Sequence, residues 1–143
     1  YEIYQCDWSS DVCSSDLLLP YGLPAGLAQI TVENCTGKSE TISLEMSTAA
    51  PGILANYVGA VGSRAARSGE SITLFGVGFD ASAATSVTIG TVAARVTYAG
   101  LSGSPGLYQI NLTVPDLPDG DYPLIVASGS ISTEQSLTLS IRN

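Results

Sequence analysis

The sequence contains no histidine, and charged residues make up only 13% of its 143 residues. Five lysines and arginines stand against thirteen aspartates and glutamates, a formal net charge of −8 at pH 7. A Ser-His-Asp catalytic triad is excluded because it needs an imidazole as general base. Nucleic-acid binding is disfavoured, because such proteins take much of their affinity from a basic face, and here only Arg64 and Arg67 lie close together.

Cysteines and long apolar runs are also scarce. The three cysteines are too few for the four-ligand structural zinc site when no histidine is present. No apolar run approaches the roughly 20 residues needed to cross a bilayer, so the sequence predicts no membrane span.

Residues 1–17, YEIYQCDWSSDVCSSDL, lack the basic residues and continuous apolar core of a signal peptide. Back-translated in one reading frame, they resemble a short-read sequencing adapter joined to an interrupted coding frame. We interpret them as translated library DNA, which has replaced the natural N-terminus and carries no information about export. We expect residues 1–17 to be disordered and to pack on nothing.

Without this stretch, which holds four of the thirteen acids, nine acidic residues remain against five basic ones, a net charge of −4. That value is ordinary for a soluble domain. Only Cys35 remains among the cysteines, so no intrachain disulfide is expected. A lone cysteine of this kind is predicted to be a small buried hydrophobe rather than a reactive thiol.

Strand patterns dominate from residue 28 onward. Short segments alternate apolar and polar residues with a period of two and are bounded by Gly, Pro, Asn, Asp or Ser. These segments are 28–34, 41–46, 71–79, 86–90, 94–100, 107–115, 122–128 and 136–142. Many short strands at close spacing predict an all-β, immunoglobulin-like β-sandwich.

An internal repeat suggests how the chain is divided. LPYGLPAGLAQITVEN resembles VPDLPDGDYPLIVAS at an offset of 94, and TISLEM (41–46) falls on SLTLSI (136–141) at an offset of 95. About 100 residues is one immunoglobulin-like domain. We therefore expect 18–48 to be the C-terminal hairpin of a truncated immunoglobulin-like domain and 49–143 to be a complete sandwich.

Residues 86–126, SVTIGTVAARVTYAGLSGSPGLYQINLTVPDLPDGDYPLIV, resemble the Solibacter-type uncharacterised C-terminal domain family. The stretch GESITLFGVGF (69–79) followed by VTIG also resembles the wider IPT/TIG immunoglobulin-like group. The segment between Ile53 and Gly69 is shorter than the Solibacter-type family usually shows. Gly90-Thr91 stands where that family usually has Gly-Gly, which predicts a looser turn. The resemblance implies a secreted or cell-surface bacterial multidomain protein, and it supplies no catalytic residues.

Several carboxylates are candidate metal ligands or catalysts. Asp116, Asp119 and Asp121 lie within six residues and are candidate calcium ligands, although aspartates in such loops more often bond their own turns. Glu33 and Glu45 could form a glycosidase pair, but their alternation favours solvent-facing positions. No cofactor is predicted.

Aromatic and loop residues offer a second kind of candidate. Tyr98 and Tyr108 could stack on a sugar ring, whereas tyrosines in sandwiches more often lie half-buried with the hydroxyl bonded to the backbone. The Gly- and Ser-rich segment 99–106 is either a binding tip or a plain hairpin. Asn34 and Asn111 begin glycosylation triplets that we attribute to chance.

The sequence therefore favours a non-catalytic spacer or adhesion module of a secreted or cell-surface protein. The alternative is an accessory module that binds a ligand such as carbohydrate. The expected partners are neighbouring immunoglobulin-like domains, with surface polysaccharide or protein as further options and nucleic acid excluded.

Overall fold

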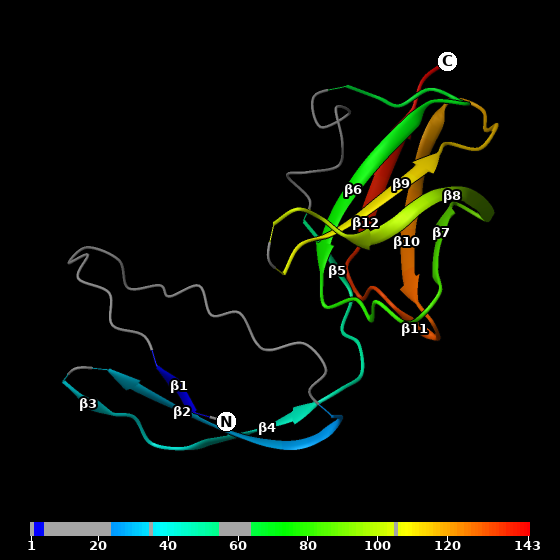
Figure 1. Cartoon of the computed structure of the whole chain (residues 1–143). Helices are drawn as coiled ribbons and strands as arrows, with labels where there is room; N and C mark the ends of the chain where they lie inside the picture. Colours follow the sequence, from blue (N-terminus) through cyan, green and yellow to red (C-terminus); the bar gives the residue numbers. More distant parts are fainter. Residues whose placement is uncertain (1, 5–23, 35, 55–63, 105) are drawn as a thin grey trace. The chain divides into compact units, whose positions relative to one another are not determined.

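The computed structural model describes residues 2–4, 24–34, 36–54, 64–104 and 106–143 (Figure 1). The chain divides into two compact units, Tyr1–Thr48 and Ala49–Asn143. The described residues are all strand, turn and loop, so the predicted all-β class is confirmed. No helix in this part of the chain is long and apolar enough to cross a membrane.

Unit 1 is built on a hairpin of β2 (Gly26–Asn34) and β4 (Ile42–Met46), which pair antiparallel from Gly26↔Met46 to Ile30↔Ile42. The two-residue strand β3 (Gly37–Lys38) pairs with the end of β2. Both long strands lie where the alternation predicted them.

Residues 2–4 depart from the expectation that 1–17 pair with nothing. They form β1 (Glu2–Tyr4), which lies parallel to Thr31–Glu33 of β2. An unpaired strand edge exposes a row of N–H and C=O groups that any extended segment can join, and β2 has such an edge. Residue 1 and residues 5–17, which include Trp8, lie outside the described residues, as does Cys35.

Unit 2 contains the strands β5 (Gly52–Ile53), β6 (Ser71–Val77), β7 (Thr85–Ile89), β8 (Val92–Leu101), β9 (Tyr108–Thr113), β10 (Gly120–Ser128), β11 (Ile131–Ser132) and β12 (Leu137–Ile141). They hydrogen-bond in the order β11-β10-β7-β8-β9-β6-β5, and β12 pairs with β10. The six strands predicted in this unit are confirmed. The short strands β5 and β11 were not expected.

Strand β8 turns this continuous ladder into a sandwich. Its first residues pair with β7, whereas Arg95 to Leu101 pair with β9, and the register shifts between Val96 and Tyr98. Such a bulge bends a strand sharply, and β8 curves from one layer into the other (Figure 1). One layer thus consists of β7, β10 and the two strands that pair with β10, β11 and β12, and the other of β9, β6 and β5.

The core lies between these layers and follows the predicted alternation. In β6, Ile72 and Leu74 are buried, and in β9 Ile110 and Leu112 are buried. From the other layer come Val87, Ile89, Leu124, Val126, Leu139 and Ile141. Every second side chain of these strands faces inward because successive side chains of a strand point to opposite faces.

The β7–β8 connection is tighter than expected. Ile89 pairs with Val92, so only Gly90 and Thr91 form the turn. Gly90 has φ +62° and Thr91 has a negative φ, which a two-residue turn with glycine in its first position allows. A second glycine is therefore not required.

Candidate functional site

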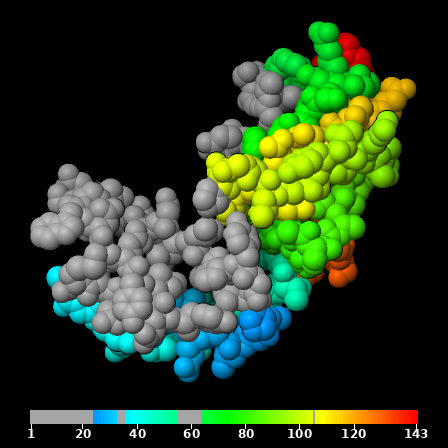
Figure 2. All heavy atoms as spheres, in the orientation of Figure 1, coloured from blue at the N-terminus to red at the C-terminus, as the bar shows by residue number. Residues whose placement is uncertain are grey.

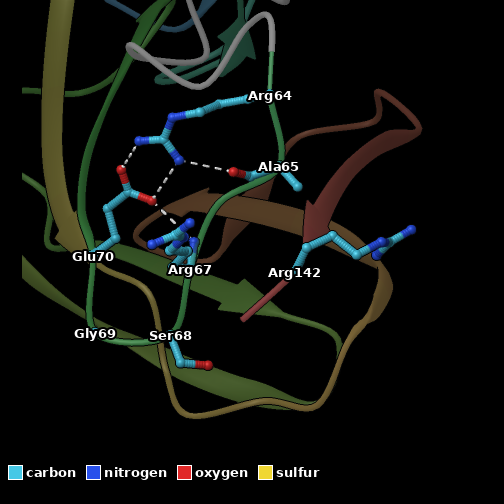
Figure 3. Close-up of a pocket in the computed structure, with 7 residues that line it drawn as sticks. All are labelled: Arg64, Ala65, Arg67, Ser68, Gly69, Glu70 and Arg142. Atoms are coloured by element: carbon cyan, nitrogen blue, oxygen red, sulfur yellow. Dashed lines mark hydrogen bonds and ion pairs between the residues drawn. The ribbon is translucent and has the colours of Figure 1, made fainter.

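A hollow lined largely by charged and polar residues lies at the end of the sandwich where β12 terminates. Its volume is about 780 Å³, and we call it the arginine pocket (Figure 3). Its lining residues are Arg64, Ala65, Arg67, Ser68, Gly69, Glu70 and Arg142.

The pocket exists because segment 64–70 is held against the last strand. Ala66 is fully buried and forms a parallel bridge with Ile141. The Ala66 amide donates to Ser140 O at 2.8 Å, and the Arg142 amide donates to Ala66 O at 2.9 Å. A tight turn follows, in which the Glu70 amide donates to Arg67 O and Gly69 adopts φ +77°. The bridge and the turn together place segment 64–70 beside Arg142.

Glu70 organises one wall of the pocket. Arg64 binds it with both terminal nitrogens, and the Arg67 amide donates to Glu70 Oε2 at 2.9 Å. The hydrogen bonds from Arg64 and then from the Arg67 amide hold the pKa of Glu70 below its usual range. The same carboxylate raises the pKa of Arg64, so the pair stays ionised at neutral pH.

Arg142 extends away from this pair (Figure 3). Its Nη2 contacts Asp121 Oδ1 at 3.0 Å, and its Nη1 donates to Gly120 O and Ile141 O. The pKa of Asp121 is lowered, first by a hydrogen bond from Ser140 and then by Arg142. Among the described residues, Arg67 therefore contributes the one guanidinium of this pocket that lacks an ion pair. The pocket can attract an anion, and it offers no nucleophile–base pair.

The three candidate calcium ligands are not gathered around a common point. Asp119 Oδ1 accepts from the Asn143 amide at 2.9 Å, Asp121 pairs with Arg142, and Asp116 is exposed. No group of three acidic or cysteine side chains within the described ranges could share a metal ion. Asp119 and Asp121 instead fasten the C-terminal residues to the 117–121 loop.

The two candidate sugar-stacking tyrosines have different environments. Tyr108 is 3% exposed and its ring stacks on Phe79 with centroids 4.7 Å apart, so neither face is offered to a ligand. Tyr98 is 45% exposed, and its hydroxyl donates to Leu101 O. It lies on β8, which together with the start of the following loop forms much of the visible surface of unit 2 (Figure 2). The hydroxyl of Tyr122 donates to Pro118 O at 3.0 Å.

The remaining sequence candidates are kept apart or used by the fold. Glu45 lies opposite Leu27 on β2, six residues from Glu33, which separates the two backbones by about 20 Å at about 3.3 Å per residue. A glycosidase pair needs roughly 5–10 Å. Asn111 lies within β9 and its side-chain oxygen accepts from Thr73 and Gln109.

Sequence reasoning missed a clamp at the opposite end of unit 2. The Gln135 side chain accepts from the Ile53 amide at 2.6 Å and donates to Ile53 O at 3.0 Å. It thereby bonds the backbone of β5 as a neighbouring strand would. The two residues are 82 positions apart, and nothing local in STEQSL marks the glutamine for this role.

In a comparison with known families, the profile described as the IPT/TIG domain aligns with residues 61–141. These residues run from just before the arginine pocket to the end of β12. No curated protein matches the chain.

Two similar solved structures have low sequence identity. One is the Bacteroides ovatus mixed-linkage glucan utilization locus protein SGBP-B in complex with a mixed-linkage heptasaccharide, with 21% identity and a TM-score of 0.44. The alignment covers 87% of this chain and 31% of that one. The other is the S-layer protein SbsC, domains 4 and 5, with 14% identity, a TM-score of 0.29 and coverage of 82% and 65%. The chain thus spans less than two thirds of either structure.

Proposed function

The chain belongs to the IPT/TIG domain family, and we propose that it is a non-catalytic spacer or adhesion module of a secreted or cell-surface bacterial protein with several domains. Within that family we assign it to the Solibacter-type C-terminal domains, on the pattern of residues 86–126. Its mechanical role would be to hold neighbouring domains apart while it presents its loops.

The path of the chain through unit 2 carries this proposal. The chain enters at β5, which pairs with the C-terminal end of β6 at Val77. It leaves at Asn143, whose side chain accepts from the Ser68 amide just before β6 begins. These points lie at opposite ends of the sandwich (Figure 1), separated by the length of β6, about 20 Å.

Both ends are fastened by side chains that bond to the backbone. Gln135 clamps β5 through its two bonds to Ile53. At the other end, Asn143 contacts Asp119, Leu117 and Ser68. A force applied between the two ends of unit 2 would therefore act first on these hydrogen bonds, before the core strands separate.

The test pulls the full chain between two marker domains in a single-molecule force experiment. Unit 2, Ala49–Asn143, should unfold in one event that releases roughly 300 Å of chain, at about 3.4 Å per residue. Gln135→Ala should lower the unfolding force, whereas Gln109→Ala, which removes a hydrogen bond on the outer face of β9, should not. Gradual extension without a force peak would refute a spacer role.

A second candidate function, an accessory ligand-binding module, is supported by Arg67 in the arginine pocket. Arg67 forms no ion pair with any residue that the structure describes, and such a guanidinium in an open hollow would favour a carboxylate- or sulfate-bearing polysaccharide over a neutral one. The test is retention on acidic and neutral polysaccharide arrays, with Arg95→Ala as the matched control for Arg67→Ala and with Tyr98→Ala as a probe of sugar stacking. Retention of no polysaccharide by the unmodified chain would remove this candidate.

A further inference from the structure

The hairpins β2–β4 and β10–β12 have the same register. The structure pairs Gly26 with Met46 and Ile30 with Ile42 in the first hairpin. In the second it pairs Gly120 with Ile141 and Leu124 with Leu137. Adding 94 to each β2 number and 95 to each β4 number, the offsets of the sequence repeat, converts all five pairs of the first hairpin into the five pairs of the second.

The inward faces of the two hairpins also correspond. Opposite partners in an antiparallel pair lie on the same face, so one face of the first hairpin carries Gly26, Ala28, Ile30, Val32, Ile42, Leu44 and Met46. The matching face of the second carries Gly120, Tyr122, Leu124, Val126, Leu137, Leu139 and Ile141. Both faces are almost wholly apolar.

Their burial, in contrast, differs strongly. Val126 and Leu139 are 0% and 3% exposed, whereas the equivalent Val32 and Leu44 are 39% and 43% exposed. Ile42 is 55% exposed. In unit 2 the face of β10–β12 belongs to the same core cluster as Ile72 and Leu74 of β6 and Ile110 and Leu112 of β9.

We infer that the apolar face of β2–β4 is an interaction surface for one particular partner, the β6–β9 half of an immunoglobulin-like sandwich. In the parent protein this partner would be a preceding domain of the same kind, which the hairpin completes. The surface takes strands with the inward pattern of Ile72, Leu74, Ile110 and Leu112. The inference goes beyond the spacer role and does not depend on it, because tandem domains could equally carry a ligand site.

The experiment replaces the second hairpin by a copy of the first within the full chain. Residues 26–46 replace residues 120–141, and unit 2 should still unfold in one cooperative transition, with slow amide exchange in 71–77 and 108–113. The matched control inserts residues 27–47 instead. This graft has the same length, but its one-residue shift turns Gln29, Thr31 and Glu45 inward, and it should lose the cooperative transition.

A second variant tests the inference if the grafted chain fails to fold because of its loop alone. A copy of residues 49–117 is placed directly before residue 24 of the full chain, which leaves the hairpin and its own loop intact. Amide exchange in 28–32 and 42–46 should slow on the order of 100-fold relative to the unmodified chain. The same insertion with Ile30→Asp should not gain this protection, whereas Leu27→Asp, on the opposite face, should.

Three results would overturn the inference. The first is that both grafts unfold alike, since the register would then be irrelevant. The second is that the in-register graft fails and the inserted copy of 49–117 gives no added protection. The third is that the unmodified chain forms a stable dimer in sedimentation and that Leu44→Asp dissociates it. A second copy of the chain would then cover the apolar face of β2–β4. None of these results bears on the force measured for unit 2.

Discussion

At the scale of single residues, tyrosine hydroxyls and glycines secure the turns of unit 2. The ring of Tyr122 lies over Gly90 and Gly120, where an added Cβ would approach it to 2.9 and 3.0 Å. Its hydroxyl bonds to Pro118 O. One aromatic side chain thus ties the β7–β8 turn to the loop before β10.

Gly90→Ala should destabilise unit 2 by about 1–3 kcal/mol, because the methyl group meets Tyr122 and because φ +62° is strained for alanine. Chemical denaturation measures the difference. Gly103→Ala is the control, since a Cβ there meets nothing within 4 Å and its φ is not positive. Equal stabilities for the two variants would contradict this explanation.

The Glu70 carboxylate should give the arginine pocket a defined pH dependence. Its pKa is lower in the folded than in the unfolded protein, because Arg64 and the Arg67 amide bond to the ionised form. The unfolded state therefore binds more protons at acidic pH, and the stabilisation is present above the unfolded pKa and lost as pH falls through the folded one. The wild-type Tm should exceed that of Glu70→Gln at pH 7, and the difference should vanish in acid. A difference independent of pH would contradict the assignment.

At the scale of elements, local alternation accounts for the strands of five or more residues. The period-two pattern of SITLFGV and YQINLT predicts which side chains of β6 and β9 are buried, and the structure buries those side chains. The two-residue strands β3, β5 and β11 have no such pattern. They form because a neighbouring strand supplies hydrogen bonds, which a short window of sequence does not reveal.

Amide exchange should separate the elements. Strands β6, β9 and β10 lie beside a closed core, so their amides should exchange only through global or subglobal opening. The hairpin β2–β4 has an exposed apolar face, and an isolated hairpin is marginal in water. Its amides should exchange at least 100-fold faster, on the order expected for local opening. Equal protection in 28–46 and 107–126 would show that the hairpin is already covered.

The residues of the candidate site could be predicted only in part from the sequence. The closeness of Arg64 and Arg67 was visible in the sequence, but the arrival of Arg142 depends on the Ala66–Ile141 bridge across 75 residues. The carboxylates Asp116, Asp119 and Asp121 are close in the chain, yet the fold uses two of them to bind Asn143 and Arg142. Spacing in the sequence therefore suggested a metal site that the arrangement of these side chains does not form.

At the scale of the whole molecule, the buried core cluster of the described residues runs from Ile53 to Ile141. Deleting residues 1–48 should therefore change the Tm of unit 2 by no more than about 2 °C, because about 1 kcal/mol corresponds to roughly 4–8 °C in a domain of this size. Differential scanning calorimetry of the full and shortened chains measures this. A large loss of Tm would mean that unit 1 supports the sandwich.

The sequence by itself determined the all-β class, the positions of the long strands and the matching hairpin patterns, because alternation and turn residues act over a few neighbouring positions. Tertiary structure alone decided that β8 serves both layers, that Tyr108 is enclosed against Phe79, and that Gln135 clamps Ile53. These features depend on hydrogen bonds and packing between residues tens of positions apart. Which distant partner a side chain meets is settled only when the two layers close over a common core.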